Sequence, residues 1–314
     1  MSEQGIAFTD SLTGLKELGH TGVRIPEVGL GTWNYHAGPG PLRKGLESGA
    51  CFIDTAESYG NETTVREAIR GLRDQVFIAT KVSPQHFRGP DIIRSAEQSL
   101  RKLGIERIDL LQLHEPNPSI PIAETMSAME ELVNVGKVRF IGVSNFSVSQ
   151  LQEAQQALSK HRVVSNQVRY SLIDRTIESG LLQYCQTHQV TVIAYSPLGR
   201  DFSRIRDCDP DHAIDQLAQQ TGKTPAQLVI NWCLCRDGVV AIPKSSSLEH
   251  VLENCLASGW RLTREQLLLL DKKIRFRRRT RMDMLLRRWT PGFARTIASH
   301  AMRALPSALR RRIH

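Results

Sequence analysis

The chain has 314 residues, 40% of them hydrophobic, which is enough for the core of one large α/β domain or of two ordinary ones. No stretch approaches the roughly 18–20 apolar residues that a membrane-spanning helix requires. The first ten residues, MSEQGIAFTD, lack the basic and apolar regions of a secretory signal. These features predict a cytoplasmic protein and argue against an integral membrane protein or a secreted one.

The net charge of +9 is distributed unevenly along the chain. Residues 271–314 contain 14 lysines and arginines and two acidic residues, a net charge of +12, which leaves about −3 for residues 1–270. We therefore expect a mildly acidic globular domain over residues 1–273 and a basic amphipathic tail over residues 274–314.

Short β-branched or apolar runs alternate with helical patterns along the chain. Residues 17–27 precede the first strand and are expected to form a small hairpin. The predicted strands are 27–33, 50–56, 75–81, 107–114, 138–145, 163–168, 190–196 and 239–244, with helical patterns such as 90–104 and 121–137 between them. Near-continuous apolar strands separated by single helices are typical of a parallel sheet covered by helices. Eight such units in roughly 250 residues predict a (β/α)8 barrel, with the hairpin at its bottom, rather than an open doubly wound sheet.

Six cysteines are present, with neither a CxxC pair nor histidines at zinc-site spacing. Several lie within apolar runs, so we expect reduced thiols in the core rather than disulfides or a metal site. They are Cys51, Cys185, Cys208, Cys233, Cys235 and Cys255.

The predicted strands end in polar or amphipathic side chains. These are Trp33, Asp54, Lys81, His114, Asn145, Gln167, Tyr195 and Lys244. A single polar strand end is usually a helix cap or a solvated edge. Functional residues of a (β/α)8 barrel collect at the carboxyl ends of its strands, so eight such residues on one rim predict a binding or catalytic site.

Four residues near this rim suit one kind of chemistry. Each of these residues, taken singly, has a structural explanation. Asp54 could cap a helix and Tyr59 could belong to the core. Lys81 could be a solvated rim residue, and His114 could be a structural histidine. Together they can protonate a carbonyl oxygen while a nucleophile attacks its carbon. A tyrosine with a pKa near 10 is a weak acid at neutral pH, and we expect a neighbouring lysine ammonium to lower that pKa. In this interpretation Asp54 holds Lys81, and His114 orients the carbonyl.

The chain resembles the aldo-keto reductase family, in its bacterial type. The matching motifs are GLGTW (29–33), GACFIDTAESYGNE (49–62), IATK (78–81), DLLQLH (109–114), GKVRFIGVSNF (136–146), NQVRYS (166–171), AYSPLG (194–199), GKTPAQLVINW (222–232) and IPKSSS (242–247), in this order. The resemblance implies a barrel that binds a nicotinamide cofactor without a Rossmann domain, in agreement with the absence of a GxGxxG motif that opens a helix. It also implies reversible hydride transfer from NADPH to an aldehyde or ketone, with Tyr59 as the general acid.

The resemblance further implies a set of cofactor-binding residues. Ser144, Asn145 and Gln167 would hold the carboxamide of the nicotinamide, and Tyr195 would stack on its ring. Other residues implied along the cofactor are Thr32, Trp33, Ser196 and Leu198. Those implied for the adenosine 2′-phosphate are Lys244, Ser245 and Ser247, with Glu253 and Asn254 for the adenosine. SSSLEH (245–250) also has the composition of a helix N-cap, which is compatible with phosphate binding.

Two positions depart from the family pattern. Glu115 stands where the family usually has a tryptophan in an HWP motif, so the substrate pocket expected from Trp33, Tyr59, His114 and Glu115 is more polar and disfavours anionic substrates. His250 stands where the family often has an arginine for the 2′-phosphate, and a neutral histidine assists charge binding less. NADPH is the expected cofactor, with NADH as the alternative.

The tail does not resemble the loops that close the pocket in the family. Apolar residues recur every three or four positions between arginines, with interruptions at Pro291 and Pro306. The alternatives are a helix packed on the barrel, peripheral contact of residues 275–314 with an anionic membrane surface, and a protein partner or non-specific nucleic acid. No specific nucleic-acid module is recognisable. We expect a monomer that reduces a small-molecule carbonyl; the rival interpretation is a regulatory or membrane-associated barrel that acts through its tail.

Overall fold

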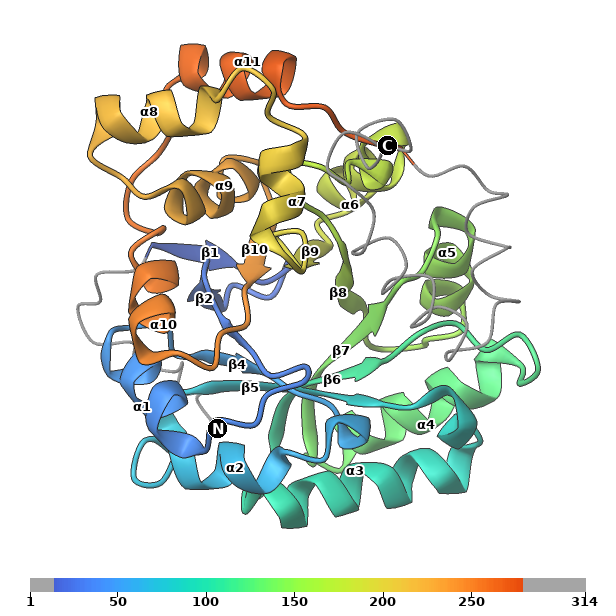
Figure 1. The fold of residues 1–314 in the computed structure, drawn as a ribbon. Coiled ribbons are helices and arrows are strands. Elements are labelled where there is room, and N and C mark those ends of the chain that lie inside the picture. Colours follow the sequence, from blue (N-terminus) through green and yellow to red (C-terminus); the bar gives the residue numbers. More distant parts are fainter. Residues whose placement is uncertain (1–13, 279–314) are drawn as a thin grey trace, which may run out of the picture.

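The protein folds as a (β/α)8 barrel, as the sequence predicts (Figure 1). The structure, a computed structural model, describes residues 14–278. The barrel strands are β3 (Leu30–Gly31), β4 (Phe52–Asp54), β5 (Phe77–Val82), β6 (Ile108–Leu113), β7 (Val138–Ser144), β8 (Val163–Arg169), β9 (Thr191–Tyr195) and β10 (Val239–Ile242). All neighbouring strands in this sheet are parallel. Each predicted strand is present, and most begin or end within one or two residues of the expected position.

The first and last strands close the barrel. Val28 forms a parallel bridge with Ala241, and the backbone N–H of Gly29 donates to the Ala241 oxygen at 2.8 Å. Close approach of the two strands requires a glycine at position 31, because a Cβ there would lie 2.7 Å from the carbonyl oxygen of Ile242.

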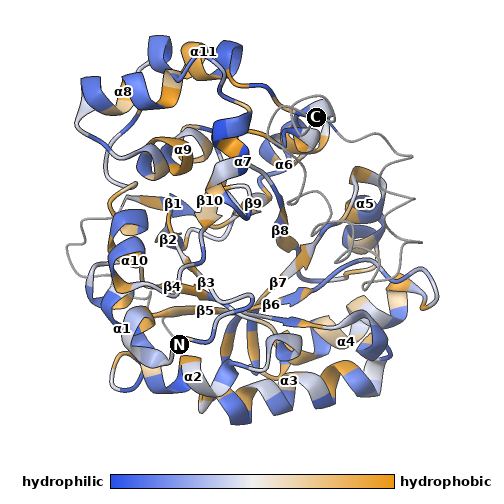
Figure 2. Cartoon of the chain, viewed as in Figure 1, coloured by the Kyte–Doolittle hydropathy of each residue, from blue (hydrophilic) through white to orange (hydrophobic). Residues whose placement is uncertain are grey.

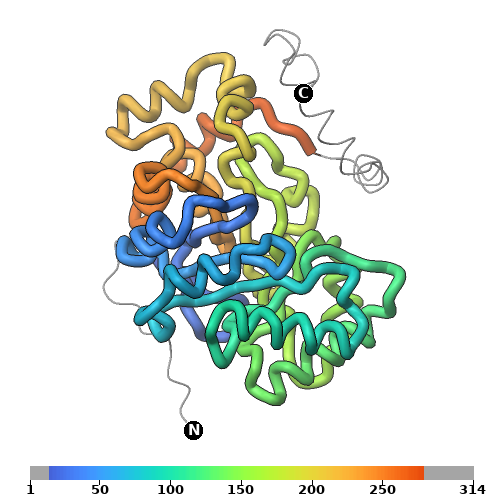
Figure 3. Tube along the Cα trace, turned by 60° about the horizontal axis from the view of Figure 1, so that its bottom comes forward, coloured from blue at the N-terminus to red at the C-terminus, as the bar shows by residue number. Residues whose placement is uncertain are grey.

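Helices surround the sheet and cover its outer face. They are α1 (Pro39–Glu47), α2 (Glu62–Ala68), α3 (Gly89–Leu103), α4 (Ile122–Asn134), α5 (Val148–Gln156), α6 (Leu181–Thr187), α7 (Phe202–Asp207), α8 (Ala213–Thr221), α9 (Pro225–Leu234), α10 (Leu248–Cys255) and α11 (Arg264–Lys273). Short 3₁₀ turns are η1 (Glu57–Tyr59), η2 (Arg73–Gln75), η3 (Pro84–His86) and η4 (Thr176–Ser179). Figure 3 shows that α10, near the end of the described chain, lies beside α1 near its beginning.

The helix sequences explain why each buries one face. In α3 the buried residues Ile92, Ala96, Leu100 and Leu103 recur every three or four positions, which places them on one side of the helix. The helix ends at Gly104, whose left-handed conformation (φ 65°) is cheap only for glycine. Figure 2 shows the same alternation of hydrophobic and hydrophilic colour on the surrounding helices.

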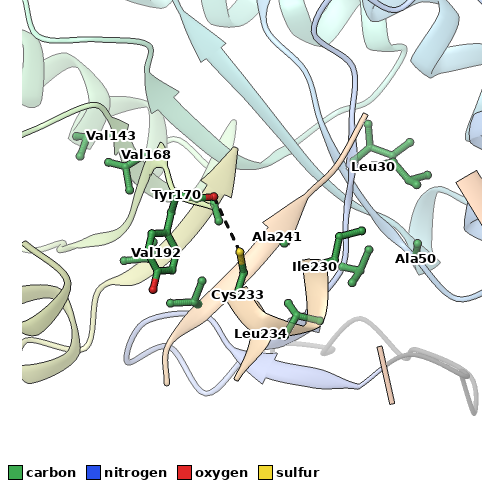
Figure 4. Packing of buried hydrophobic residues seen from close by; sticks show 14 of the residues in the cluster. Leu30, Ala50, Val143, Val168, Tyr170, Val192, Ile230, Cys233, Leu234 and Ala241 are labelled. Carbon is green, nitrogen blue, oxygen red and sulfur yellow. Dashed lines mark hydrogen bonds between the residues drawn. The ribbon is translucent and has the colours of Figure 1, made fainter. Parts of the chain in front are cut away.

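Two hydrophobic clusters hold the fold together. The outer cluster lies between the strands and the helices; Figure 4 draws part of it, with Val143, Val168 and Val192 from the sheet and Ile230, Cys233 and Leu234 from α9. The inner cluster fills the barrel and includes Phe52 and Phe77, whose rings meet edge to face with centroids 5.6 Å apart.

The predicted hairpin is present as β1 (Leu15–Glu17) and β2 (Arg24–Pro26), which pair antiparallel. Leu18 and Ile25 from this hairpin belong to the inner cluster. The N–H of Gly19 donates to the hydroxyl of Thr191 at 2.7 Å, at the amino end of β9. The hairpin therefore closes the end of the barrel opposite the predicted site.

Four of the six cysteines, Cys185, Cys208, Cys233 and Cys255, are buried, as expected for core thiols. Within the described part of the chain, none of the helices has the length and hydropathy that a membrane crossing needs.

The domain boundary at residue 273 coincides with the end of α11 but stays a prediction. Phe276 and Arg277, just beyond it, still contact the barrel: the guanidinium of Arg175 lies 4.2 Å from the centre of the Phe276 ring, and the backbones of Arg277 and Asp174 form an isolated parallel β-bridge. The predictions for the basic tail fall on residues 279–314, apart from its first few residues, and lie outside the described part of the chain.

Candidate active site

A cavity of about 570 Å³ opens at the carboxyl ends of the barrel strands. Its wall contains seven of the eight predicted rim residues, and the eighth, Lys81, is 1% exposed and lies beneath the floor. The predicted residues in the wall are Trp33, Asp54, Tyr59, His114, Glu115, Ser144, Asn145, Gln167, Tyr195, Ser196, Leu198 and Lys244. Proteins bind small molecules in cavities of this volume, and (β/α)8 barrels bind them at this end of the strands.

Lys81 and Asp54 form a buried ion pair at the bottom of the cavity. The Lys81 Nζ donates to Asp54 Oδ2 at 2.6 Å and to the carbonyl oxygen of Thr55 at 2.8 Å. Burial opposes the charge on Lys81, but Asp54 and Tyr59 outweigh it and raise the pKa of Lys81 above its ordinary value. The lysine therefore remains an ammonium at neutral pH.

Two buried amides complete the surroundings of Asp54. Its Oδ1 accepts hydrogen bonds from Gln167 Nε2 at 2.6 Å and from Gln112 Nε2 at 3.2 Å. Both carboxylate oxygens are thus satisfied, which a buried carboxylate requires. Asp54 serves here as an anchored counter-ion, in agreement with the sequence interpretation of its role.

Tyr59 places its hydroxyl between Lys81 and His114. It lies on η1, and the turn is completed by Gly60 in the left-handed conformation (φ 69°). The hydroxyl is 3.5 Å from Lys81 Nζ and 3.5 Å from His114 Nε2. The two rings meet edge to face, with centroids 5.5 Å apart. A substrate oxygen beside the Tyr59 hydroxyl would therefore lie within reach of the imidazole.

The protonation states of Tyr59 and His114 follow from burial. Burial raises the pKa of Tyr59 above its ordinary value, and Lys81 offsets part of that rise. The prediction of a net lowered tyrosine pKa is therefore wrong, because burial of the phenolate raises the pKa by more than the Lys81 ammonium lowers it. Burial, assisted by Lys81, lowers the pKa of His114 to about 4. At neutral pH the phenol is protonated and the imidazole is neutral.

One side of the cavity carries a connected set of amide and hydroxyl groups. The Ser144 hydroxyl donates to the Gln167 carbonyl oxygen at 2.9 Å, and Asn145 Nδ2 donates to the Ser144 hydroxyl at 3.0 Å. The Tyr195 hydroxyl donates to Asn145 Oδ1 at 3.1 Å. Asn145 adopts the left-handed conformation (φ 62°), which asparagine tolerates better than most residues. The arrangement offers donors and acceptors beside an aromatic ring.

The remaining predicted residues lie outside the cavity wall. Thr32 is fully buried and donates to the Asp54 carbonyl oxygen at 3.0 Å. Ser247 is the N-cap of α10 and accepts from the His250 N–H at 3.5 Å, so this segment does cap the helix, as expected. The other members of this set, Ser245, Glu253 and Asn254, lie before and within α10.

The structure adds site residues that the sequence argument missed. Gln112 is one; it stands out in hindsight as the polar residue within the apolar run DLLQLH. Arg200 is another, since it lines the cavity and its guanidinium lies 5.1 Å from the centre of the Trp33 ring. Glu57 is a third: it accepts from the Ser83 N–H at 2.6 Å and lies 2.9 Å from His86 Nδ1, which ties η1 to the cavity loop after β5.

Comparison with known proteins decides the family. A family model described as the aldo/keto reductase family matches residues 27–275. The chain belongs to the aldo/keto reductase family. Methylglyoxal reductase YeaE of Escherichia coli (strain K12) is 38% identical over 261 residues, which cover 80% of this chain and 91% of that protein. The resemblance read from the motifs is confirmed.

Solved aldo-keto reductases have the same fold as this chain. The Klebsiella pneumoniae aldo-keto reductase in complex with NADPH gives a TM-score of 0.79 at 37% identity, over 85% of this chain and 97% of that one. An aldo/keto reductase of the same organism in complex with NADP and acetate gives 0.77 at 37% identity, over 86% and 98%. As an aldo/keto reductase, this chain is an NAD(P)H-dependent oxidoreductase that acts on small carbonyl compounds.

The residues of this cavity fit a nicotinamide cofactor. The hydrogen-bonding set of Ser144, Asn145 and Gln167 suits a carboxamide, and Tyr195 offers an aromatic face beside it. Lys244 supplies a positive charge farther along the wall.

Proposed function

We propose that this aldo/keto reductase reduces small, polar aldehydes and ketones with NADPH, and that Tyr59 donates the proton. The proton donor lies 3.5 Å from both a buried ammonium and a neutral imidazole, and this is the observation that carries the proposal. The NADP and NADPH complexes of the two Klebsiella relatives support the choice of cofactor. The reduced cofactor, when bound, supplies the hydride.

Each residue of the catalytic set has a defined part in the proposal. The neutral His114 donates a hydrogen bond to the carbonyl oxygen and orients it beside the Tyr59 hydroxyl. As negative charge develops on that oxygen, Tyr59 transfers its proton, and the nearby ammonium of Lys81 stabilises the phenolate that remains. Asp54 keeps Lys81 charged and in place within the buried floor.

The cofactor is held by the residues implied by the family pattern. Ser144, Asn145 and Gln167 bind the carboxamide, and Tyr195 stacks on the ring. Further residues proposed along the cofactor are Thr32, Trp33, Ser196, Leu198, Lys244, Ser245, Ser247, His250, Glu253 and Asn254. The exposed position of Lys244 in the cavity wall supports a role in binding the 2′-phosphate, and therefore a preference for NADPH over NADH.

The polar wall near His114 supports the substrate class. Ser58, Gln85 and Glu115 line the cavity there, so hydroxylated or hydrated carbonyl compounds find hydrogen-bond partners, and a carboxylate substrate meets the like charge of Glu115. Methylglyoxal, which names the Escherichia coli relative, is small, polar and uncharged and fits this description.

The test follows the oxidation of NADPH with methylglyoxal and with nitrobenzaldehyde. Tyr59→Phe should lower kcat by about 10²–10⁴-fold, the usual contribution of a general acid, and leave the affinity for NADPH nearly intact. Unchanged turnover would refute the assignment of the acid, and a protein that binds NADPH but reduces no carbonyl would refute the activity.

Two further proposals concern the whole chain. The protein acts as a monomer, and residues 275–314 contact an anionic membrane surface; the excess of basic residues after Asp271 supports the second. Analytical ultracentrifugation checks the first, and sedimentation with anionic and with neutral vesicles checks the second.

A further inference from the structure

Four arginines converge beside the active-site cavity, behind the loop that follows β9. Two small adjoining cavities of about 20 and 50 Å³ are lined by Arg169 and Arg275 respectively, and both are lined by Arg204 and Arg277. We call the surface formed by Arg169, Arg204, Arg275 and Arg277 the arginine groove. Ser196 lines both the groove and the large cavity, so the loop that begins there separates the two sites.

The arginines come from segments that backbone hydrogen bonds fix in place. Arg169 ends β8 and Arg204 lies in α7. The Arg275 N–H donates to the Cys208 carbonyl oxygen at 2.9 Å, and the Arg277 N–H donates to the Ile173 carbonyl oxygen at 3.2 Å. The chain thus holds four cationic side chains together at a fixed place, rather than on freely moving loops.

Carboxylates compensate the positive charge of the groove only in part. Asp174 is the one acidic residue among the lining residues of the two cavities, and it accepts a hydrogen bond from the Thr176 hydroxyl at 2.7 Å. Two further aspartates lie outside the lining, Asp201 near Arg204 and Asp211 near Arg275. Within the described residues, none of the four arginines forms an ion pair within 4.0 Å. Four guanidinium groups therefore face a single carboxylate in the lining.

Individual donors in the groove also lack partners. The Nε of Arg169 is buried and, among the described residues, makes no hydrogen bond, a state that costs free energy unless a ligand satisfies it. Arg204 donates one long hydrogen bond, 3.5 Å to the Gly199 carbonyl oxygen. Burial lowers the pKa of Arg204, and repulsion from Arg169 and Arg277 lowers it further.

We propose that the arginine groove is a second anion site, which binds a small oxyanion of the phosphate class separately from the cofactor. Guanidinium groups present paired donors that match phosphate oxygens. About 10–15 Å³ is enough for one water molecule, so the two adjoining cavities have room for an ion of a few heavy atoms. The bound anion would link α7, the end of β8 and the segment 275–277.

The experiment measures binding of inorganic phosphate to the full chain saturated with NADP⁺, by calorimetry at constant ionic strength with chloride as the balancing anion. Arg204→Gln and Arg277→Gln should each weaken phosphate binding about tenfold or more, the effect of losing one charge-assisted hydrogen bond. Arg162→Gln is the matched control: it removes one exposed arginine at the opposite end of β8 and should change phosphate affinity less than about twofold.

Three outcomes would overturn the proposal: no phosphate binding by the wild-type protein, equal binding by the groove variants, or binding that NADP⁺ abolishes. The last outcome would make the groove part of the cofactor site. If Arg204→Gln or Arg277→Gln does not fold, as judged by circular dichroism, the exposed Arg275→Gln carries the same expectation of weakened binding.

Discussion

Asp54 binds Lys81, Gln112 and Gln167 through its two carboxylate oxygens. The pair with Lys81 is nearly inaccessible to solvent, with side-chain exposures of 3% and 0%. Formation of such a pair contributes little net stability, but loss of one partner leaves an uncompensated buried charge. We therefore expect the stability of the protein to be sensitive to the loss of either partner of the Asp54–Lys81 pair.

Asp54→Asn should lower the free energy of unfolding by about 3 kcal/mol, because it leaves the Lys81 ammonium buried without a counter-ion. It should also lower kcat, because Lys81 can then lose its proton or move away from Tyr59. Urea unfolding and NADPH oxidation measure the two effects. Asp74→Asn, at an exposed position, should change neither, and equal stability of the two variants would show that the pair is dispensable.

His114 gives the protein a stability that depends on pH. Its pKa in the folded protein is about 4, below the 6.5 of an unperturbed histidine, so the unfolded chain binds the proton more readily. The stability that the neutral His114 contributes is therefore fully present above pH 6.5 and is lost as the pH falls toward 4. Between pH 7 and pH 5, wild-type protein should lose about 2 kcal/mol more than His114→Gln does. Urea unfolding at the two pH values measures the difference, and parallel losses would contradict the assigned pKa.

At the scale of the elements, the strands were predictable because each is a short apolar run between helical patterns. Most residues of the cavity wall were predictable because they stand at or just after strand ends. Gln112 was missed because it lies within a strand, and only the register of β6 shows that its side chain reaches Asp54. The direction of the Tyr59 pKa shift was missed because a sequence does not give the degree of burial.

The arginine groove could not be predicted from the sequence, for a different reason. Arg169, Arg204 and Arg277 come from β8, α7 and the segment after α11, and no local pattern relates them. Their proximity depends on where the segment 275–277 crosses the barrel, which backbone hydrogen bonds decide.

The link between η1 and the loop after β5 supports a prediction at this scale. Glu57 lies two residues before Tyr59, and its carboxylate accepts from the Ser83 N–H. Glu57→Gln should lower the free energy of unfolding by about 1–2 kcal/mol and raise KM for the carbonyl substrate, since Ser83 and Gln85 line the cavity. Glu67→Gln, exposed on α2, is the control for steady-state kinetics and unfolding. An unchanged KM would show that the loop holds its position without Glu57.

At the scale of the whole molecule, the two ends of the closed barrel differ: one carries the cavity, and the other carries contacts that stabilise the fold. Polar side chains at the carboxyl ends of the strands form the cavity, while the opposite end is closed by the hairpin. There, Lys16 Nζ donates to the carbonyl oxygens of Leu234, Arg236 and Val239 at 2.5, 3.0 and 2.8 Å. A long-range connection at this end joins early and late parts of the chain.

Glu27 makes that connection. It is fully buried just after β2, and it accepts hydrogen bonds from the Ser258 hydroxyl at 2.7 Å and from both terminal nitrogens of Arg261. Burial by itself would raise the pKa of Glu27, but these donors outweigh it and lower that pKa. The carboxylate is therefore retained in its charged form between the first barrel strand and the segment that joins α10 to α11.

Arg261→Ala should lower the free energy of unfolding by about 2 kcal/mol, less than for a fully buried pair because the Arg261 side chain is 44% exposed. The values of kcat and KM should stay unchanged, since this contact lies at the end of the barrel opposite the cavity. Arg264→Ala, an exposed position on α11, controls for the loss of one surface arginine. In the double variant Glu27→Gln with Arg261→Ala, the loss should be smaller than the sum of the single losses, because the stranded charge is gone. Additive losses in urea unfolding would show that the two residues stabilise the barrel independently.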